Sequence, residues 1–356
     1  MRQSPNWILL RWPASLHDAL KSMGRMSLLR NLSNKKFVST TMSVIKQAVN
    51  LKTLSSQDLT AFFDSFDTVL TDCDGVLWIQ NTALPHSAEV INLFQELGRQ
   101  VFYVTNNSTK TREEFAKKCK QLNFKASDDH LFCTSNLAAL YLKSMNFRKK
   151  VYVIGSTGVT GELDKVGIRH IGTGPDPLTP DWTAMNVQKD PEVGAVIVGF
   201  DEHFSYPKMT KAASYLNDRD VHFIGTNTDN RFPAKDSVVV PGTGSLVSCI
   251  EMCSERKATI MGKPEPYIAD VLKQQCNIDP KRTIMIGDRD KSDILLGTRC
   301  GFKTLLVLSG VTTLNDVDRC KKSSSKDDND LVPDYYIDTL GDLYPHLQKY
   351  KLHNSN

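Results

Sequence analysis

The feature that most constrains the fold is a repeated alternation of short apolar runs with helical patterns. Runs rich in β-branched and apolar residues occur at 68–71, 101–104, 151–154, 193–198, 221–224, 283–286 and 304–308. Helical spacing of apolar residues lies between them, at 87–97, 112–122, 135–145, 206–217, 266–275 and 292–300. Such alternation predicts an α/β fold, with a Rossmann-like parallel sheet that carries helices on both faces.

The length and charge of the chain limit its organisation and its partners. With 356 residues, the chain can form two compact domains or one domain with an insertion. The net charge of +4 comes from the first 50 residues, where eight Lys and Arg face a single acid, Asp18. The remainder is slightly acidic, so we expect no nucleic-acid partner. No apolar run approaches the roughly 18 residues of a membrane span, so we expect no membrane partner either.

Two further features concern the cellular compartment. Eight cysteines are scattered without CxxC pairs, which is typical of reduced thiols in the cytosol or the mitochondrial matrix. Residues 1–52 form a basic N-terminal extension, and residues 1–41 have the composition of a mitochondrial presequence, with a processing region near 36–39. An extension without fixed structure, or translation from Met42, would explain the same composition.

Candidate catalytic acids follow the first strand. Ligands of parallel sheets bind at the carboxyl ends of the strands, and Asp72, Asp74 and Gly75 follow the run 68–71. A carboxylate is ionised at neutral pH, so Asp72 could attack phosphorus without a general base. A divalent cation must then offset the repulsion from an anionic phosphate ester, and oxygen ligands suit Mg²⁺. Asp74 could protonate the leaving alkoxide and later activate water. Taken alone, the DxD pattern fits a turn or a helix cap equally well.

A second pair of acids follows the strand at 283–286, in the pattern GDxxxxD. Asp288 could be the second protein ligand of the metal, and Asp293 could orient Asp288 without contacting the metal itself. The alternative is that Asp288 caps the following helix.

Phosphate-binding groups are expected in two more segments, 105–107 and the one around Lys263. Thr105, Asn106 and Asn107 offer a hydroxyl, side-chain amides and backbone N–H groups to phosphate oxygens. Lys263 precedes a predicted helix and could offset the charge of the nucleophile and the phosphate. Taken alone, Asn-Asn-Ser is a common turn, and a lysine before a proline is usually a surface residue.

The order of these motifs, DxDG, TNN, Lys and GDxxxxD, resembles the haloacid dehalogenase-like phosphatase superfamily. The long insertion between the second and third motifs is typical of its capped members. The resemblance implies that Asp72 is the nucleophile of an aspartyl-phosphate intermediate and that Asp74 is the acid/base. It implies these further roles: phosphate contacts at Thr105, Asn106 and Lys263, and Mg²⁺ ligands at Asp72, the Asp74 carbonyl and Asp288.

Longer stretches narrow the resemblance to one group. Segments 72–78, 199–206, 225–231, 241–245 and 332–336 look like the animal phosphoglycolate/glycerol-3-phosphate phosphatases, close to pyridoxal phosphate phosphatase, over about residues 53–350. The resemblance implies a phosphoric monoester hydrolase for a small phosphorylated metabolite, foremost 2-phosphoglycolate or glycerol 3-phosphate. Pyridoxal 5′-phosphate or phosphotyrosine are the alternative substrates, and a weakly active paralogue acting as a binding protein is the alternative outside the enzymes. A dehydrogenase is disfavoured because no G-x-G-x-x-G follows the first strand.

The resemblance also implies a domain plan. A phosphatase core would comprise 53–147 and 258–350, an α/β cap 148–257, and a tail 351–356. The cap would exclude water and recognise the leaving group, with His203 near the substrate and Arg231 as a further contact. The alternative for His203 is that it fixes its own loop by hydrogen bonds. The resemblance would also allow a homodimer through the cap, and a cytoplasmic location is the default of the family.

Two positions depart from the family pattern. Lys291 replaces an acid near the metal site and could weaken Mg²⁺ binding if its side chain points inward. Thr71 stands where an apolar residue is usual. Because side chains alternate along a strand, Thr71 should face away from the site.

Overall fold

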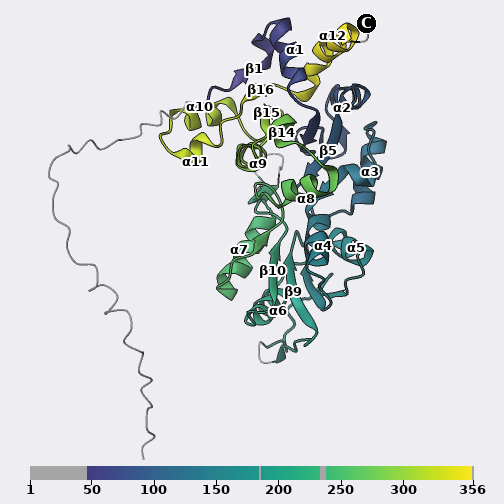
Figure 1. Ribbon diagram of the computed structural model, residues 1–356. Coiled ribbons are helices and arrows are strands. Elements are labelled where there is room, and N and C mark those ends of the chain that lie inside the picture. The colour runs from purple at the N-terminus through teal and green to yellow at the C-terminus, as the bar shows by residue number, and fades with distance from the viewer. Residues whose placement is uncertain (1–45, 184–185, 233–237, 355–356) are drawn as a thin grey trace, which may run out of the picture. The chain divides into compact units, whose positions relative to one another are not determined.

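The computed structural model describes residues 46–183, 186–232 and 238–354 (Figure 1). The proposed presequence and the alternative start at Met42 lie outside this part of the chain. Within it, every helix is too short or too polar to cross a bilayer.

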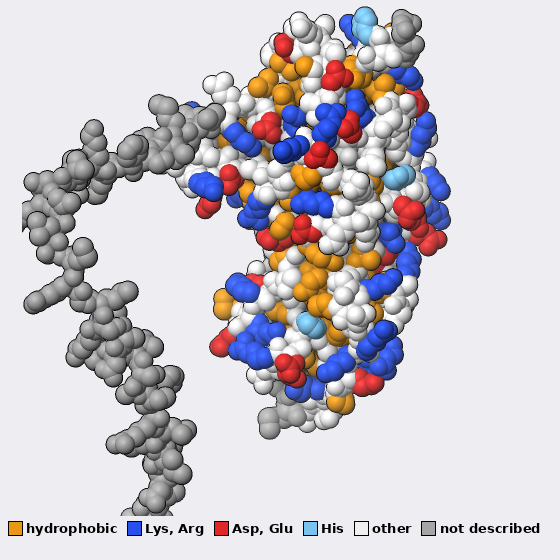
Figure 2. Space-filling view, in the orientation of Figure 1, with side chains coloured by type: hydrophobic (Ala, Val, Ile, Leu, Met, Phe, Trp, Pro, Cys, Tyr) orange, Lys and Arg blue, Asp and Glu red, His pale blue; other side chains and the backbone are white. Residues whose placement is uncertain are grey.

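All eight cysteines are free thiols. Acidic and basic side chains are intermixed on the face drawn in Figure 2.

The main sheet has seven strands in the order β1-β16-β15-β14-β2-β5-β6, and every neighbouring pair is parallel. Its strands are β1 (Val49–Asn50), β2 (Thr68–Thr71), β5 (Gln100–Thr105), β6 (Leu131–Cys133), β14 (Thr283–Gly287), β15 (Lys303–Val307) and β16 (Tyr335–Ile337). β2 pairs with β14 on one side and with β5 on the other. The three strands that precede the acidic and TNN motifs are therefore neighbours, and the predicted α/β class is confirmed.

Both faces of this sheet are buried, as alternation along β5 shows. Val101 and Tyr103 belong to a core cluster with helices on one face, whereas Phe102 and Val104 belong to a second cluster on the other face. The first cluster includes side chains of α1 (Ser56–Asp64), α2 (Ser87–Glu96), α3 (Arg112–Gln121) and α12 (Tyr344–Asn354). The second includes side chains of α4 (Thr134–Ser144), α8 (Tyr267–Cys276) and α9 (Leu295–Cys300).

A second parallel sheet has the order β13-β10-β9-β7-β8. Its strands are β7 (Lys150–Ile154), β8 (His170–Ile171), β9 (Val193–Val198), β10 (His222–Gly225) and β13 (Thr259–Ile260). One face packs on α6 (Tyr206–Leu216) and α7 (Thr243–Ser254), while residues of the other face join the cluster of α4. α5 (Thr157–Lys165) also contributes to that cluster. The two sheets thus share part of one core.

The loop after β5 connects the two sheets. Ser108 contacts groups that follow three strands of the second sheet: its carbonyl accepts from Ser156 Oγ at 3.3 Å, and its hydroxyl lies 3.4 Å from both Phe200 N and Thr226 Oγ1. The carboxyl ends of both sheets therefore meet at this loop. The boundaries predicted for the cap, 148 and 257, stay a prediction.

Some segments differ from the sequence-based expectation. Val49 and Asn50, assigned to the extension, pair with β16, and the helix α12 continues into the residues assigned to the tail. The segment 321–330, which is rich in charged residues and serine, holds the end of α10 (Leu314–Lys322) and the short helix α11 (Lys326–Asn329). These elements are short or highly charged, so their apolar pattern was too weak to predict them.

Candidate active site

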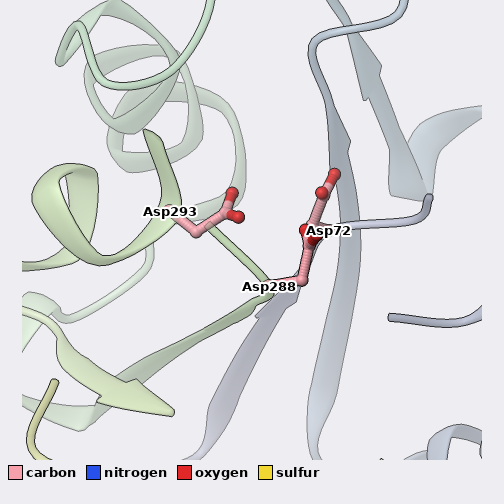
Figure 3. A group of neighbouring side chains, drawn as sticks. All are labelled: Asp72, Asp288 and Asp293. Atoms are coloured by element: carbon pink, nitrogen blue, oxygen red, sulfur yellow. The ribbon is translucent and has the colours of Figure 1, made fainter. Parts of the chain in front are cut away.

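Three carboxylates meet at the carboxyl edge of the main sheet. Asp72 follows β2 and Asp288 follows β14, and one carboxylate oxygen from each of Asp72, Asp288 and Asp293 lies within 4.8 Å of the others. Asp293 comes from the π-helical turn Asp290–Ile294, and its carboxylate points toward the other two in Figure 3. Parallel pairing of β2 with β14 brings the first two acids together, as the motif order predicts.

A buried lysine binds two of these acids. Lys263 Nζ lies 2.7 Å from Asp72 Oδ1 and 2.7 Å from Asp293 Oδ1, and it donates a hydrogen bond to the Val104 carbonyl at 2.8 Å. Burial alone would lower the pKa of Lys263, but the carboxylates of Asp293 and Asp72 raise it above its ordinary value. The ammonium group therefore stays charged beside the proposed nucleophile.

The remaining acid, Asp288, has an unused ligand atom. Its Oδ2 accepts a hydrogen bond from Val311 N at 2.9 Å, whereas its buried Oδ1 has no hydrogen-bond partner in the described part of the chain. Burial, together with the carboxylates of Asp72 and Asp293, raises the pKa of Asp288 to about 8. A divalent cation would satisfy this oxygen and offset the crowded charges, so the donor set fits Mg²⁺.

Asp293 is already engaged by other groups. Its Oδ2 accepts a hydrogen bond from Arg289 N at 3.1 Å, and its Oδ1 contacts the ammonium of Lys263. Burial raises the pKa of Asp293 to about 6, with the charge of Lys263 opposing the shift. These contacts suit the orienting role predicted for Asp293, and leave Asp72 and Asp288 as the carboxylates that would hold Mg²⁺.

Asp74 lies against an indole and a second lysine. Its Oδ1 accepts a hydrogen bond from Trp78 Nε1 at 2.9 Å and lies 4.0 Å from Lys118 Nζ. That ammonium also lies 4.4 Å from the centre of the Trp78 ring. Burial raises the pKa of Asp74, which suits a group that must give and take a proton. Lys118 carried no motif in the sequence, and only the packing of α3 brings it here.

The side chain of Asn106 binds other residues of the protein. Its Oδ1 accepts from Lys263 N at 2.8 Å, and its Nδ2 donates to the Lys263 carbonyl and to Asp229 Oδ2, both at 3.1 Å. Both amide protons are used, so a phosphate contact by this side chain would break one of these bonds. These bonds hold the backbone of the buried lysine. The phosphate contacts expected from Asn106, Thr105 and Asn107 stay predictions.

These groups surround a cavity of about 390 Å³. Loops that follow strands of the main sheet contribute Asp72, Asp74, Asn106, Asn107 and Asp288, and Thr105 is the last residue of β5. Lys263 follows β13 of the second sheet, Asn227 and Asp229 follow β10, Arg231 and Phe232 form β11, and Thr243 begins α7. Asp229 was not predicted, although it lies in the stretch 225–231 that the sequence singled out. It bonds to Asn106, and its Oδ1 lies 3.7 Å from Arg289 Nη1.

Three other predicted positions lie away from the cavity. His203 is absent from the described residues that line it, and its ring is 43% exposed beside Glu202. Its role as a substrate contact stays a prediction. Lys291 is exposed and does not line the cavity. Thr71 is buried, lies outside the lining, and donates to the Asp72 carbonyl at 2.8 Å.

The glycine at position 75 lets the loop after β2 approach Asp288 closely. Its φ is +89°, and a Cβ at this position would lie 2.7 Å from Asp288 Oδ2. We expect Gly75→Ala to displace Asp288 and to lower kcat/KM at least about tenfold, because small displacements of catalytic groups cost rate steeply. Gly98→Ala is the matched control, since Gly98 has a similar φ of +78° with nothing within 4 Å of its Cβ. Equal activity of the two variants would contradict the proposed approach.

The fold and this site define a class of enzyme: a hydrolase with a Rossmann-like parallel sheet, in which carboxylates and a buried lysine meet at the carboxyl ends of the strands. The family model described as "Haloacid dehalogenase-like hydrolase" matches residues 69–169, and a second model of HAD-hydrolase-like proteins matches residues 260–343. The chain belongs to the haloacid dehalogenase-like hydrolases, which confirms the family predicted from the motif order.

Curated relatives and solved structures agree with this assignment. The chain is 42% identical to human glycerol-3-phosphate phosphatase over 307 residues, which covers 83% of this chain and 95% of that protein. It is 37% identical to human chronophin over 286 residues, covering 79% and 93%. The p-nitrophenyl phosphatase from Archaeoglobus fulgidus superposes with a TM-score of 0.66 at 25% identity, covering 79% of this chain and 99% of that chain.

Proposed function

We propose that the protein is a Mg²⁺-dependent phosphomonoester hydrolase for small metabolites, with 2-phosphoglycolate and glycerol 3-phosphate as its foremost substrates. The observation that carries the proposal is Asp72, held at 2.7 Å by a buried lysine at the edge of a cavity that Asp288 also lines. The similarity to glycerol-3-phosphate phosphatases supports glycerol 3-phosphate as a substrate.

The geometry supports a two-step reaction. A carboxylate oxygen of Asp72 forms a bond to phosphorus as the bond from phosphorus to the ester oxygen breaks, and Asp74 gives its proton to the departing oxygen. Asp74 then takes a proton from water as that water attacks the aspartyl-phosphate, which regenerates Asp72 and releases phosphate. Lys263 offsets negative charge throughout. Mg²⁺, when held by Asp72, Asp288 and the Asp74 carbonyl, would neutralise charge between the nucleophile and the phosphate oxygens.

A substrate panel tests the proposal. We expect the full chain to hydrolyse 2-phosphoglycolate or glycerol 3-phosphate with the highest kcat/KM, and to lose turnover when EDTA removes Mg²⁺. Pyridoxal 5′-phosphate and phosphotyrosine belong in the panel as the alternative substrates. A dominant preference for pyridoxal 5′-phosphate would reject our choice of substrate, and turnover of none of these esters would favour a binding protein.

Lys291 bears on the weakly active alternative. Because its side chain is exposed and lies outside the cavity lining, we expect Lys291→Glu to change the Mg²⁺ concentration for half-maximal activity by less than about threefold. A Mg²⁺ titration of initial rates measures this. A much larger gain in apparent affinity would mean that the lysine weakens the metal site.

Assembly and location are part of the proposal. A homodimer through residues 148–257 follows the family resemblance, and sedimentation velocity tests it. A cytoplasmic location follows the family, and the matrix is the alternative if residues 1–41 act as a presequence. Imaging of the full chain with a C-terminal tag distinguishes the two. We propose no nucleic-acid or membrane partner.

A further inference from the structure

We infer that Arg231 selects substrates that carry a carboxylate beside the phosphate ester. The inference rests on the proposed function and adds the group that would distinguish its two foremost substrates. The cavity is lined by the proposed catalytic acids, by Lys263, and by two arginines, Arg231 and Arg289. An arginine that has no acidic partner within the protein can bind an anionic group of the substrate other than its phosphate.

Arg289 contacts two neighbouring acids. Its Nη1 lies 3.7 Å from Asp229 Oδ1, and its backbone N–H donates to Asp293. Asp229 in turn accepts a hydrogen bond from Asn106 through its other oxygen. The charges of Arg289 and Asp229 therefore offset each other at the cavity wall.

Arg231 has no such partner. With the described residues, its side chain forms no ion pair within 4.0 Å and no hydrogen bond, although it belongs to the cavity lining. It is exposed, so its guanidinium is accessible to a ligand. Among the described residues that line it, the cavity thus has one uncompensated positive charge besides the groups assigned to the phosphate and the metal.

The backbone around Arg231 is held on both sides. β11 (Arg231–Phe232) pairs with β12 (Val240–Pro241), and the Asn230 carbonyl accepts hydrogen bonds from Gly242 N at 2.9 Å and Ser245 Oγ at 3.1 Å. A Cβ on Gly242 would lie 2.3 Å from the Asp229 carbonyl oxygen, so this approach requires glycine. On the other side, the ring of Phe232 packs edge-on against Phe200 with centroids 5.0 Å apart.

An unpaired guanidinium on a well-held backbone suits a carboxylate. Its planar donors match two carboxylate oxygens, and such charge-assisted pairs are stronger than bonds to neutral hydroxyls. A phosphorylated carboxylic acid, of which 2-phosphoglycolate is the smallest, would form this pair. Glycerol 3-phosphate, with two hydroxyl groups instead, would not.

The test compares the selectivity of variants of the full chain, measured as kcat/KM for 2-phosphoglycolate divided by kcat/KM for glycerol 3-phosphate. Loss of a charged hydrogen-bond pair predicts that Arg231→Gln lowers this ratio about 10- to 100-fold, and that Arg231→Lys lowers it less. Arg219→Gln is the matched control, because Arg219 is also exposed but lies outside the cavity lining.

The outcomes separate the inference from the proposed function. A ratio in Arg231→Gln that differs no more than in Arg219→Gln overturns the inference and leaves the phosphatase intact. Equal losses for both esters also overturn it, because they indicate a structural role. Wild-type protein that hydrolyses neither ester overturns the proposed function, and the inference with it.

Discussion

Asp72→Asn is expected to lower kcat for every phosphate ester at least about 10⁴-fold, because removing a catalytic nucleophile typically costs this much or more. The substitution removes the anionic oxygen that would attack phosphorus and keeps the volume of the side chain. It also removes one of two proposed carboxylate ligands of Mg²⁺. Initial rates with p-nitrophenyl phosphate and with 2-phosphoglycolate measure the loss.

The fold should tolerate this change. Lys263 keeps its 2.7 Å contact with Asp293, and the loss of the Asp72 charge also removes repulsion on Asp288. We therefore expect the free energy of unfolding in urea to change by less than about 2 kcal/mol. Turnover that persists in a folded Asp72→Asn protein would show that another group attacks phosphorus.

Asp74→Asn provides the comparison that separates the two acids. It keeps the proposed nucleophile and removes the proton donor, so alkyl esters should lose more rate than p-nitrophenyl phosphate, whose phenolate leaves with little acid help. A loss that is equal for alkyl and aryl esters would place Asp74 in the metal site alone.

The sequence predicted those parts of the site that depend on local pattern. β2, β5 and β14 read clearly as buried strands, and the rule that ligands bind at the carboxyl ends of parallel strands directed attention to Asp72 and Asp288. Parallel pairing then makes their proximity a consequence of strand order. The sequence did not predict the two-residue strand β1 or the three-residue strand β6, because two or three residues are too few to show a periodic pattern.

What the sequence could not show are the contacts between distant segments. The side-chain amide of Asn106 binds the Lys263 backbone and Asp229, and these contacts depend on the approach of segments more than 100 residues away in the sequence. Lys118 looks like any surface lysine of a charged helix until α3 places it over Trp78. Conversely, His203 lies in a stretch that resembles the family, yet its side chain lies outside the cavity lining.

Lys263→Met is expected to destabilise the protein as well as inactivate it. The Lys263 side chain is 2% exposed, and its ammonium contacts both Asp72 and Asp293, so its removal leaves two carboxylates without their counter-charge. Breaking a buried ion pair in this way costs about 3–5 kcal/mol. Urea unfolding in EDTA measures this cost, because the absence of Mg²⁺ prevents the metal from replacing the lost charge.

Two further variants separate stability from catalysis. In Lys263→Met/Asp293→Asn, one uncompensated carboxylate is gone, so part of the lost stability should return while turnover stays at least about 100-fold below wild type, the usual cost of losing a charge-stabilising group. Lys208→Met is the matched control, since Lys208 forms an equally buried pair with Asp201 at 2.6 Å and neither residue lines the cavity. It should lose stability by a similar amount and keep most of its kcat/KM. If Lys208→Met lost activity as severely as Lys263→Met, the inactivation would reflect weakened folding, and the assignment of Lys263 to charge stabilisation at phosphorus would be wrong.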